Sequence, residues 1–412
     1  MAVEVGGSVA AASPEWPAAL DVDRLVDNGW QPTPFRQFLL KVHSRCNLSC
    51  DYCYIYTMAD QSWRHRPMTM EPSLLAWTAQ RIAEHSLAHG LDSVRIILHG
   101  GEPLLTGHSY LAGAVRSLRA TLRVIPRVHI GVQTNAVLLD EDFLRLFRSL
   151  GVHVGVSLDG DAAAHDRHRH QVDGRGSHAS VSRALRLLMR PENQQVYGGL
   201  LCTIDICNDP ITTYEAVLGF DPPAVDFLLP HGTWSTPPPG RDRDSTHTPY
   251  AEWLIAVFDR WYTAPRRETR VRLFEEIIHL LLGGASHIEA VGLTPTSLVV
   301  VETDGNIEQA DTLKSTYHGA PTTGLHVERD PFDAALRIPS IAARQLGYQA
   351  LSEECAGCRL RQVCGAGLYP HRYRAGSGFR NPSVYCPDLF RLIDYIRKRV
   401  TADLRAQPGA GR

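Results

Sequence analysis

Between residues 35 and 234, short apolar runs alternate with amphipathic stretches, and this alternation restricts the fold more than any other feature of the sequence. Six runs are predicted strands, at 38–43, 94–100, 128–135, 152–160, 198–205 and 225–232. Amphipathic helical patterns lie between them, for example at 74–90 and 140–151. Repeated strand–helix units form a parallel sheet that helices cover. We therefore expect an α/β fold with a partial (βα)6 TIM-like barrel, whose functional groups lie at the carboxyl ends of the strands.

The remainder of the chain departs from this rhythm. Prolines and charges after the sixth predicted strand cannot continue a strand or a helix. A later apolar run with an Asp304-Gly305 turn predicts a hairpin, and a cysteine-rich segment follows it. The predicted segments are a loosely ordered N-terminal lead-in at 1–34, the barrel at 35–234, a loop and helical linker region at 235–296, a cysteine-rich domain at 297–400 and a flexible tail at 401–412.

Charge and hydropathy exclude several classes of protein. The formal net charge is -2, which gives no electrostatic reason to expect nucleic acid as a partner. No apolar run reaches the length of a membrane span, and residues 1–20 lack the features of a signal peptide. We expect a cytoplasmic protein that binds neither nucleic acid nor a membrane. In that reducing compartment, clustered cysteines indicate metal binding rather than disulfides.

Three cysteines follow the first predicted strand closely. They are Cys46, Cys50 and Cys53, with the spacing Cx3Cx2C. Iron–sulfur clusters are commonly held by four thiolates, so three thiolates leave one iron free for a small molecule. A structural zinc site uses four protein ligands. A zinc knuckle and cysteines of an ordinary core are the alternatives.

A second motif follows the second predicted strand, where Gly100, Gly101, Glu102 and Pro103 occur in sequence. Two glycines allow the backbone to approach a ligand closely, and a carboxylate can receive an ammonium group. Taken alone, the same residues form an ordinary strand-to-helix turn.

Together the two motifs resemble those of the radical S-adenosylmethionine (SAM) enzymes. The resemblance implies that the three cysteines bind a 4Fe–4S cluster whose fourth iron chelates SAM. It also implies cofactor contacts at the ends of further strands. The expected SAM-binding residues are Tyr52, Gly100, Gly101, Glu102, Pro103, Gln133, Asn135, Ser157, Arg169 and Leu201. Helix capping is the alternative role for the polar residues that follow the third and fourth strands.

Four more cysteines occur near the C-terminus, and four thiolates suffice for one fully ligated iron–sulfur cluster. They are Cys355, Cys358, Cys364 and Cys386. Their arrangement resembles the SPASM domain of radical SAM enzymes that modify peptides. A full SPASM domain binds two clusters, but this chain has Leu368 and Ala310 where further cysteines are expected. The resemblance therefore implies a SPASM-like domain with one auxiliary 4Fe–4S cluster, and a four-cysteine zinc site is the alternative.

Asp311 follows Ala310 directly. In SPASM enzymes that oxidise serine or cysteine, an aspartate at this point is the base that removes a proton from the substrate, so the resemblance implies a catalytic role for Asp311. The alternative is a solvated hairpin residue. His231 and Trp234, after the sixth strand, are candidates for lining the path of a peptide, and ordinary packing is their alternative.

Longer stretches extend the resemblance over most of the chain. PFRQFLLKVHSRC, YTMADQSW, QADTLKS, HRYR and NPSVYC resemble FxsB-type maturases. Those enzymes act on ribosomal peptides ending in Phe-x-Ser-x-x and join an aromatic ring carbon to a neighbouring side-chain β-carbon, which forms a cyclophane. The implied partners are a ribosomal precursor peptide and a reducing protein such as flavodoxin or ferredoxin. Thioether formation or formylglycine generation would use the same modules, and a non-catalytic zinc-stabilised interaction module is the alternative outside enzymes.

Overall fold

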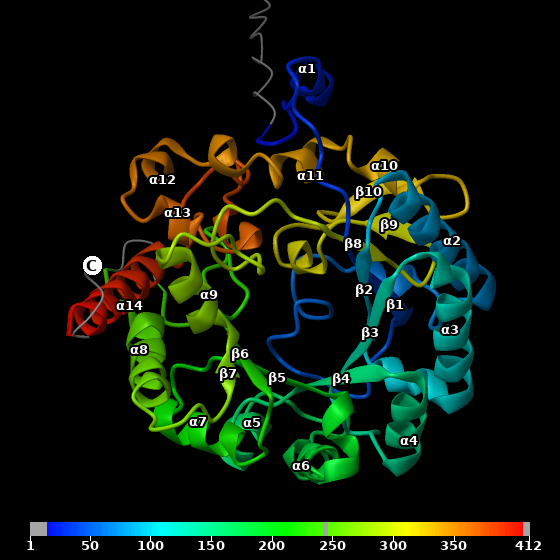
Figure 1. Ribbon diagram of the computed structural model, residues 1–412, viewed down its shortest axis with the longest axis horizontal. Coiled ribbons are helices and arrows are strands. Elements are labelled where there is room, and N and C mark those ends of the chain that lie inside the picture. Colours follow the sequence, from blue (N-terminus) through cyan, green and yellow to red (C-terminus); the bar gives the residue numbers. More distant parts are fainter. Residues whose placement is uncertain (1–14, 242–245, 407–412) are drawn as a thin grey trace, which may run out of the picture.

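The computed structural model describes residues 15–241 and 246–406, and a single ten-stranded sheet organises them. The strands are β1 (Gln37–His43), β2 (Ser93–Gly100), β3 (Arg127–Thr134), β4 (Val152–Ser157), β5 (Tyr197–Thr203), β6 (Ala224–Leu228), β7 (Arg270–Val271), β8 (Leu298–Val301), β9 (Asn306–Glu308) and β10 (Thr322–His326). In Figure 1 they lie inside an outer layer of helices.

The α-helices are α1 (Val22–Asp27), α2 (Pro72–Ala88), α3 (Gly107–Thr121), α4 (Glu141–Leu150), α5 (Ala162–Asp166), α6 (His178–Leu188), α7 (Pro210–Leu218), α8 (Pro249–Tyr262), α9 (Arg272–Leu281), α10 (Phe332–Ala335), α11 (Pro339–Ala343), α12 (Glu353–Gly357), α13 (Arg361–Cys364) and α14 (Cys386–Ala406). The 3-10 helices are η1 (Ser62–His65), η2 (Pro103–Thr106), η3 (Leu122–Val124), η4 (Pro191–Val196), η5 (Asp311–Ser315), η6 (Gly347–Ala350) and η7 (Tyr369–Arg372). None of these helices is both long enough and apolar enough to cross a membrane.

The sheet has the order β10-β9-β8-β1-β2-β3-β4-β5-β6-β7. Strands β1 to β6 are parallel neighbours in chain order, each joined to the next by helical segments. The barrel wall stays open because β1 pairs with β2 and β8, and not with β6. The predicted partial (βα)6 barrel is therefore confirmed.

Helix α4 illustrates why the sequence forms these units. The side chain of Asp140 accepts a hydrogen bond from the N–H of Phe143 at 2.9 Å and caps the helix start. Gly151 ends the helix in the left-handed conformation, with φ of 59°. Between these caps, Phe143, Leu144 and Phe147 are buried on the face that packs into the core. The apolar face that the amphipathic pattern predicts is therefore the face that packs into the core.

The C-terminal segment extends the barrel sheet. β8 pairs in parallel with β1, and β9 and β10 add antiparallel strands at that edge. A separate sheet therefore does not begin at 297, and the predicted C-terminal domain shares backbone hydrogen bonds with the barrel. The predicted linker region contains α8, β7 and α9, and β7 pairs with β6. α14 packs against both α8 and α9.

Two predictions about the ends of the chain need correction. The tail was predicted to be flexible from residue 401, but α14 continues to Ala406, so residues 401–406 are helical. The lead-in was predicted to be loosely ordered over 1–34, but α1 forms within it, capped by the side chain of Asp21. Residues 1–14 and 407–412 of these two predicted segments lie outside the described residues, as do 242–245 of the linker region.

Candidate active site

The three cysteines of the first motif lie in the loop that follows β1. The sulfur of Cys46 accepts hydrogen bonds from the backbone N–H of Leu48 at 3.4 Å and from Nδ2 of Asn135 at 3.5 Å. Burial raises the pKa of the Cys46 thiol to about 12 and that of the Cys50 thiol to about 11. Such thiols become thiolates when a bound cation stabilises the negative charge. Because hydrogen bonds to sulfur are a feature of iron–sulfur sites, the loop fits a metal cluster.

Gly100 and Gly101 allow this cysteine loop to dock against the end of β2. A Cβ atom on Gly100 would lie 2.1 Å from the carbonyl oxygen of His43, and one on Gly101 would lie 1.9 Å from the hydroxyl of Tyr56. The N–H of Gly101 donates to the carbonyl of His43 at 2.8 Å. Glycine is thus required at both positions because the cysteine loop packs closely against them. The motif predicts a further reason, which is the close approach of a ligand.

Glu102 is fully buried and joins the ends of two strands. Its carboxylate accepts hydrogen bonds from the hydroxyl of Thr134 at 2.6 Å, the N–H of Asn135 at 2.7 Å and the N–H of Leu104 at 3.0 Å. Burial raises the pKa of Glu102, and these three hydrogen bonds oppose the rise. Pro103 follows as the first residue of η2 and is also buried. In the described structure Glu102 orders the strand ends around the cysteine loop, and its contact with the SAM ammonium stays a prediction.

Tyr52, inside the cysteine motif, connects two charged side chains. Its hydroxyl donates to Oδ2 of Asp159 and accepts from Nη1 of Arg169 at 2.8 Å. Arg169 is only 8% exposed, and its Nε has no hydrogen-bond partner among the described residues. Burial raises the pKa of Cys50, and the positive charge of Arg169 opposes this rise, so the guanidinium lies near the motif. A buried guanidinium with a free donor is suited to bind a carboxylate.

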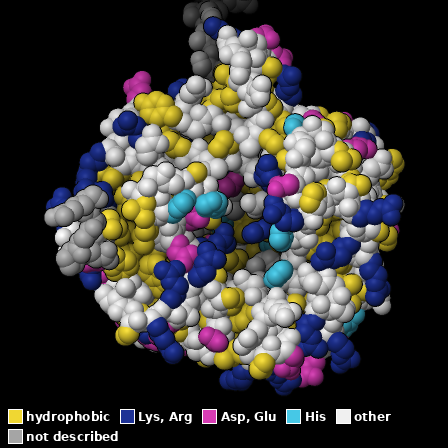
Figure 2. Space-filling model, in the orientation of Figure 1, with side chains coloured by type: hydrophobic (Ala, Val, Ile, Leu, Met, Phe, Trp, Pro, Cys, Tyr) yellow, Lys and Arg dark blue, Asp and Glu magenta, His cyan; other side chains and the backbone are white. Residues whose placement is uncertain are grey.

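The other predicted SAM contacts lie at the ends of neighbouring strands. Nε2 of Gln133 donates to Oγ of Ser157 at 3.2 Å, which links β3 to β4. Ser157 is in turn the register partner of Leu201 in β5. Asn135 reaches the cysteine loop, because its Nδ2 also donates to Oδ1 of Asn47 at 2.8 Å. The predicted contacts therefore gather at the carboxyl edge of the barrel. Figure 2 shows a hollow in the middle of the molecule with charged and histidine side chains around it.

Asp311 is buried and paired with Lys41, a residue that lies outside the cysteine and Gly100–Pro103 motifs. Its carboxylate forms an ion pair with Nζ of Lys41 in β1, lies 3.5 Å from Nζ of Lys314, and accepts a hydrogen bond from the hydroxyl of Tyr54 at 3.2 Å. Burial alone would raise the pKa of Asp311, but the two lysines hold it below its usual range. The alternative of a solvated hairpin residue is wrong, since Asp311 is 4% exposed.

This ion pair belongs to a larger buried network of charges. The carboxylates are those of Glu302, Asp304, Glu308 and Asp311, and the cations are Lys41, Arg66 and Lys314. The network therefore holds one more carboxylate than cations. Burial, together with the negative charge of Glu302, raises the pKa of Glu308 to about 7. The excess charge is relieved when Glu308 carries a proton.

A row of aromatic rings connects the two cysteine clusters. The ring of Tyr54, next to Cys53, lies 4.8 Å from that of His231, and His231 lies 5.9 Å from His371. His371 lies 4.9 Å from Tyr385, the residue before Cys386. Burial lowers the pKa of both histidines, and neither ring nitrogen of His371 has a partner among the described residues. His231 thus lies beside the Asp311 site.

Trp234, the other residue predicted to line a peptide path, is held by packing contacts. Its indole N–H donates to the carbonyl of Pro382 at 2.7 Å, and the guanidinium of Arg374 lies over its ring. These contacts support the packing alternative for Trp234.

The second group of cysteines lies where α12, α13 and α14 meet. Cys355 belongs to α12, Cys358 follows it, Cys364 ends α13 and Cys386 begins α14. Within the described residues, no three of these sulfur atoms lie within 4.8 Å of one another. Four thiolates suffice for one fully ligated iron–sulfur cluster, and a four-cysteine zinc site stays the alternative.

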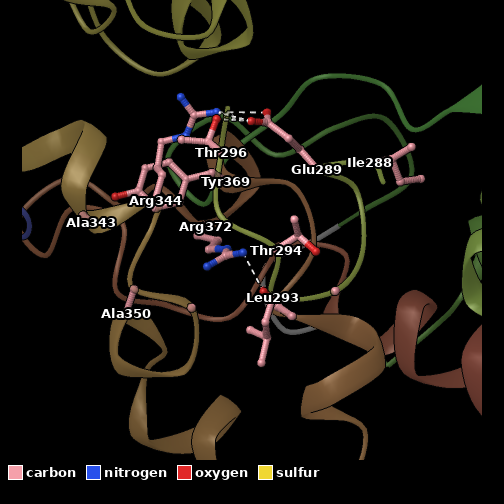
Figure 3. A pocket seen from close by; sticks show the side chains of 13 residues that line it. Ile288, Glu289, Leu293, Thr294, Thr296, Ala343, Arg344, Ala350, Tyr369 and Arg372 are labelled. Carbon is pink, nitrogen blue, oxygen red and sulfur yellow. Dashed lines mark hydrogen bonds and ion pairs between the residues drawn. The ribbon is translucent and has the colours of Figure 1, made fainter. Parts of the chain in front are cut away.

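A half-buried arginine accompanies these cysteines. Nη2 of Arg372 donates to the carbonyls of Gly365 and Gly367, at 2.6 and 2.7 Å, directly after Cys364. Burial lowers the pKa of Arg372, and negative charge at Cys364 opposes this. Figure 3 shows the cavity beside it, where the nearby Arg344 pairs with Glu289. The positive charge of Arg372 therefore lies next to the second group of cysteines.

Comparison with known proteins agrees with this geometry. The model of the radical SAM superfamily matches residues 40–190. A serine-type anaerobic sulfatase-maturating enzyme of Klebsiella aerogenes is 24% identical over 364 residues, which cover 84% of this chain and 82% of the relative. Residues 40–190 contain β1 to β4, the first cysteine motif and the Gly100–Pro103 turn.

Two solved structures share the fold. Native anSMEcpe with bound AdoMet superposes with a TM-score of 0.75 at 20% identity, over 90% of this chain and 100% of that chain. SuiB of Streptococcus suis, bound to the precursor peptide SuiA, superposes with a TM-score of 0.57 at 12% identity, over 88% of this chain and 78% of that chain. At these identities the likeness establishes the fold. Residues 40–190 match the model of the radical SAM superfamily, a family whose cofactors are SAM and a 4Fe–4S cluster.

Proposed function

We propose that this chain is a radical SAM peptide maturase that forms a C–C cyclophane crosslink between an aromatic side chain and a neighbouring side-chain β-carbon of a ribosomal precursor peptide. The observation that carries the proposal is the position of Asp311. This buried carboxylate contacts Tyr54 of the first cysteine loop and Lys41 of β1. A peptide as substrate is supported by the likeness to a sulfatase-maturating enzyme and to SuiB with its bound precursor peptide.

The residues of the barrel edge would hold the cofactors. Cys46, Cys50 and Cys53 would bind the 4Fe–4S cluster, and the free donor of Arg169 would pair with the carboxylate of SAM. When bound, these cofactors supply a 5′-deoxyadenosyl radical that removes a hydrogen atom from a carbon of the substrate. The protein's own contribution is to position the peptide and to exclude water.

Asp311 would take the proton that an aromatic ring carbon loses when the crosslink forms. That proton is strongly acidic because its loss restores aromaticity, so a carboxylate with a low pKa is a sufficient base. Lys41 and Lys314 keep Asp311 ionised, and the hydroxyl of Tyr54 fixes one of its oxygens. The carboxylate is thus held ready in the ionised form before substrate binds.

The second group of cysteines would hold one auxiliary 4Fe–4S cluster that accepts an electron from the substrate. Its members are Cys355, Cys358, Cys364 and Cys386. The guanidinium of Arg372 would offset the negative charge of that cluster. We place the reaction in the cytoplasm, with flavodoxin or ferredoxin as the reductant, because free thiols and reduced clusters need a reducing compartment.

A second candidate function is formylglycine generation. The similarity to a serine-type sulfatase-maturating enzyme over 84% of this chain favours it. In that reaction Asp311 would remove a proton from the hydroxyl of the serine that is oxidised. Thioether formation would need a cysteine in the peptide.

The test uses the reconstituted enzyme, SAM, a reductant and a synthetic peptide ending in Phe-x-Ser-x-x, under anaerobic conditions. Cyclophane formation and serine oxidation both remove two hydrogens, so the peptide mass alone does not separate them. Fragmentation blocked between Phe and Ser identifies the crosslink. Reaction of the product with hydroxylamine identifies the aldehyde of formylglycine.

The Cys46→Ala variant is the negative control, since it lacks a cluster ligand and should release no 5′-deoxyadenosine. If the wild-type enzyme releases 5′-deoxyadenosine while the peptide mass stays fixed, the radical chemistry holds and the Phe-x-Ser substrate is wrong. If the product reacts with hydroxylamine and fragments normally, formylglycine generation replaces the cyclophane proposal.

A further inference from the structure

Two histidines and an aspartate converge on the outer surface of the barrel. His85 lies in the last turn of α2, His89 is the residue that caps the C-terminus of this helix, and Asp333 lies in α10. Oδ1 of Asp333 is 2.6 Å from Nδ1 of His85 and 2.9 Å from Nε2 of His89. One ligand atom from each of the three residues lies within 4.8 Å of those of the other two.

The surroundings prepare these groups to act as ligands. His85 is packed against the rings of Phe35, Phe38 and Phe332, which fix its orientation. The side chains of His89 and Asp333 are 29% and 44% exposed, so an ion and its water can reach the site from solvent.

The charge balance distinguishes this cluster from the other convergent acidic group. Glu302, Glu308 and Asp311 also lie close together, but Lys and Arg side chains of the buried network already pair with them. At the surface cluster, the ion pairs of Asp333 among the described residues are those with the two imidazoles. No arginine or lysine among the described residues pairs with Asp333.

We propose that His85, His89 and Asp333 bind a divalent zinc-type transition-metal ion, which fastens α10 to α2. Two imidazole nitrogens and one carboxylate oxygen suit zinc and its neighbours rather than calcium or magnesium. Ligand distances of about 2.0–2.2 Å place nitrogen and oxygen about 3.3 Å apart on a tetrahedral ion, so the donors need to separate by only about half an ångström. Water completes the coordination. The proposal does not depend on the function proposed above.

Metal binding here would act on the barrel through Phe332. This residue precedes Asp333 and its ring lies 5.1 Å from that of Phe38 in β1, the strand that leads into the cysteine loop. An ion that holds α10 against α2 therefore also holds the ring of Phe332 against Phe38 of β1. The expected consequence is a gain in stability on metal binding, because the ion binds the folded chain and not the unfolded one.

The test is an anaerobic zinc titration of the holoenzyme, with all cluster cysteines loaded with iron. Wild-type protein, His89→Ala and Asp333→Asn are titrated against a competing chelating dye. His108→Ala is the matched control, because His108 faces Asp140 at 3.4 Å in an exposed pair without a second histidine. Iron content and circular dichroism establish that each variant is folded. The zinc affinities of the wild type and His108→Ala should match. His89→Ala and Asp333→Asn should each bind zinc at least about tenfold more weakly.

A second readout is the melting temperature with and without zinc, which should rise for the wild type and the control and stay fixed for the two variants. Equal zinc affinity in the wild type, His89→Ala and Asp333→Asn would overturn the proposal. Absence of zinc binding to the wild-type holoenzyme would also overturn it and would leave the three residues as a hydrogen-bonded contact between α2 and α10.

Discussion

Asp311 and Lys41 form a buried ion pair that joins the C-terminal segment to the first strand of the barrel. Their side chains are 6% and 3% exposed. A second cation, Lys314, and the hydroxyl of Tyr54 complete the surroundings of the carboxylate. Since Tyr54 directly follows Cys53, the ion pair places an ionised group next to the first cysteine loop. This relationship gives the proposed base a specific test.

The Asp311→Asn variant should cleave SAM normally but form product about a hundredfold or more slowly. The amide keeps the shape of the side chain and loses the ability to take a proton. Release of 5′-deoxyadenosine and peptide mass are measured in the same reaction. Asp304→Asn is the control, because Asp304 belongs to the same charge network and pairs with Arg66 instead of Lys41. Normal product formation by Asp311→Asn would exclude Asp311 as the base.

The Lys41→Met variant should be less stable by about 3–5 kcal/mol, because it leaves a buried carboxylate short of one partner. Urea denaturation of the anaerobic protein measures the change. The double variant Lys41→Met/Asp311→Asn should recover part of that loss, since the unpaired charge is then removed as well. A double variant that shows the sum of two independent losses would mean that the two side chains do not interact.

The Gly101→Ala variant should fail to hold the first cluster. The added Cβ would lie 1.9 Å from the hydroxyl of Tyr56 and 2.3 Å from the carbonyl of Arg45, so the cysteine loop must move. Iron content after reconstitution should fall by about four per chain, the content of one 4Fe–4S cluster. Gly113→Ala is the control in α3, where nothing lies within 4 Å of the new atom. That variant should keep its iron and gain about 0.5–1 kcal/mol of stability.

The iron content per chain tests whether the second group of cysteines binds a 4Fe–4S cluster. Reconstituted wild-type protein should contain about eight irons per chain, and the Cys386→Ala variant about four, since two 4Fe–4S clusters are expected and one loses a ligand. SAM cleavage should persist in that variant, because Cys386 lies outside residues 40–190, which match the radical SAM superfamily. Wild-type protein with about four irons and one zinc would show that the second group is a zinc site.

The architecture was predictable because its signals are local. Strands, helices and the two cysteine clusters follow from periodicity and spacing within short segments, and each predicted strand of the barrel forms. The continuation of the barrel sheet into β8 was not predicted, since the partners Leu40 and Val301 lie far apart in the sequence. Pairing between strands so far apart in the sequence cannot be predicted from either segment alone, because both are apolar and would suit other partners.

The candidate site was predictable only in part, for the same reason. The cysteines and the Gly100–Pro103 turn carry recognisable motifs. The network around Asp311 is instead assembled from residues of β1, η5 and the β8–β9 hairpin, together with Arg66, which follows η1. Lys41 did give a usable signal, since a lysine inside the apolar run FLLKVH must be buried and therefore paired. The burial of His371 gave none, because nothing in HRYR separates it from an exposed histidine.

The pKa of Glu308 is raised from 4.5 to about 7 by burial and by the negative charge of Glu302. A raised pKa means that the folded chain keeps a proton that the unfolded chain has lost. Stability from this group is therefore present below about pH 4.5 and disappears as the pH rises to about 7. A shift of that size corresponds to about 3 kcal/mol.

The Glu308→Gln variant imitates the protonated form and should remove this decline, so at pH 8 it should be more stable than the wild type by up to about 3 kcal/mol. Urea denaturation at pH 5, 6, 7 and 8 measures the difference. Glu302→Gln is the matched control: burial would raise the pKa of Glu302, but Lys314 and Arg66 hold it below its usual range, so this carboxylate is the ionised partner. Glu302→Gln should destabilise the protein at every pH in the series. If Glu308→Gln and Glu302→Gln lose stability equally at pH 8, Glu308 is ionised in the folded protein. Another group then offsets the excess negative charge of the network.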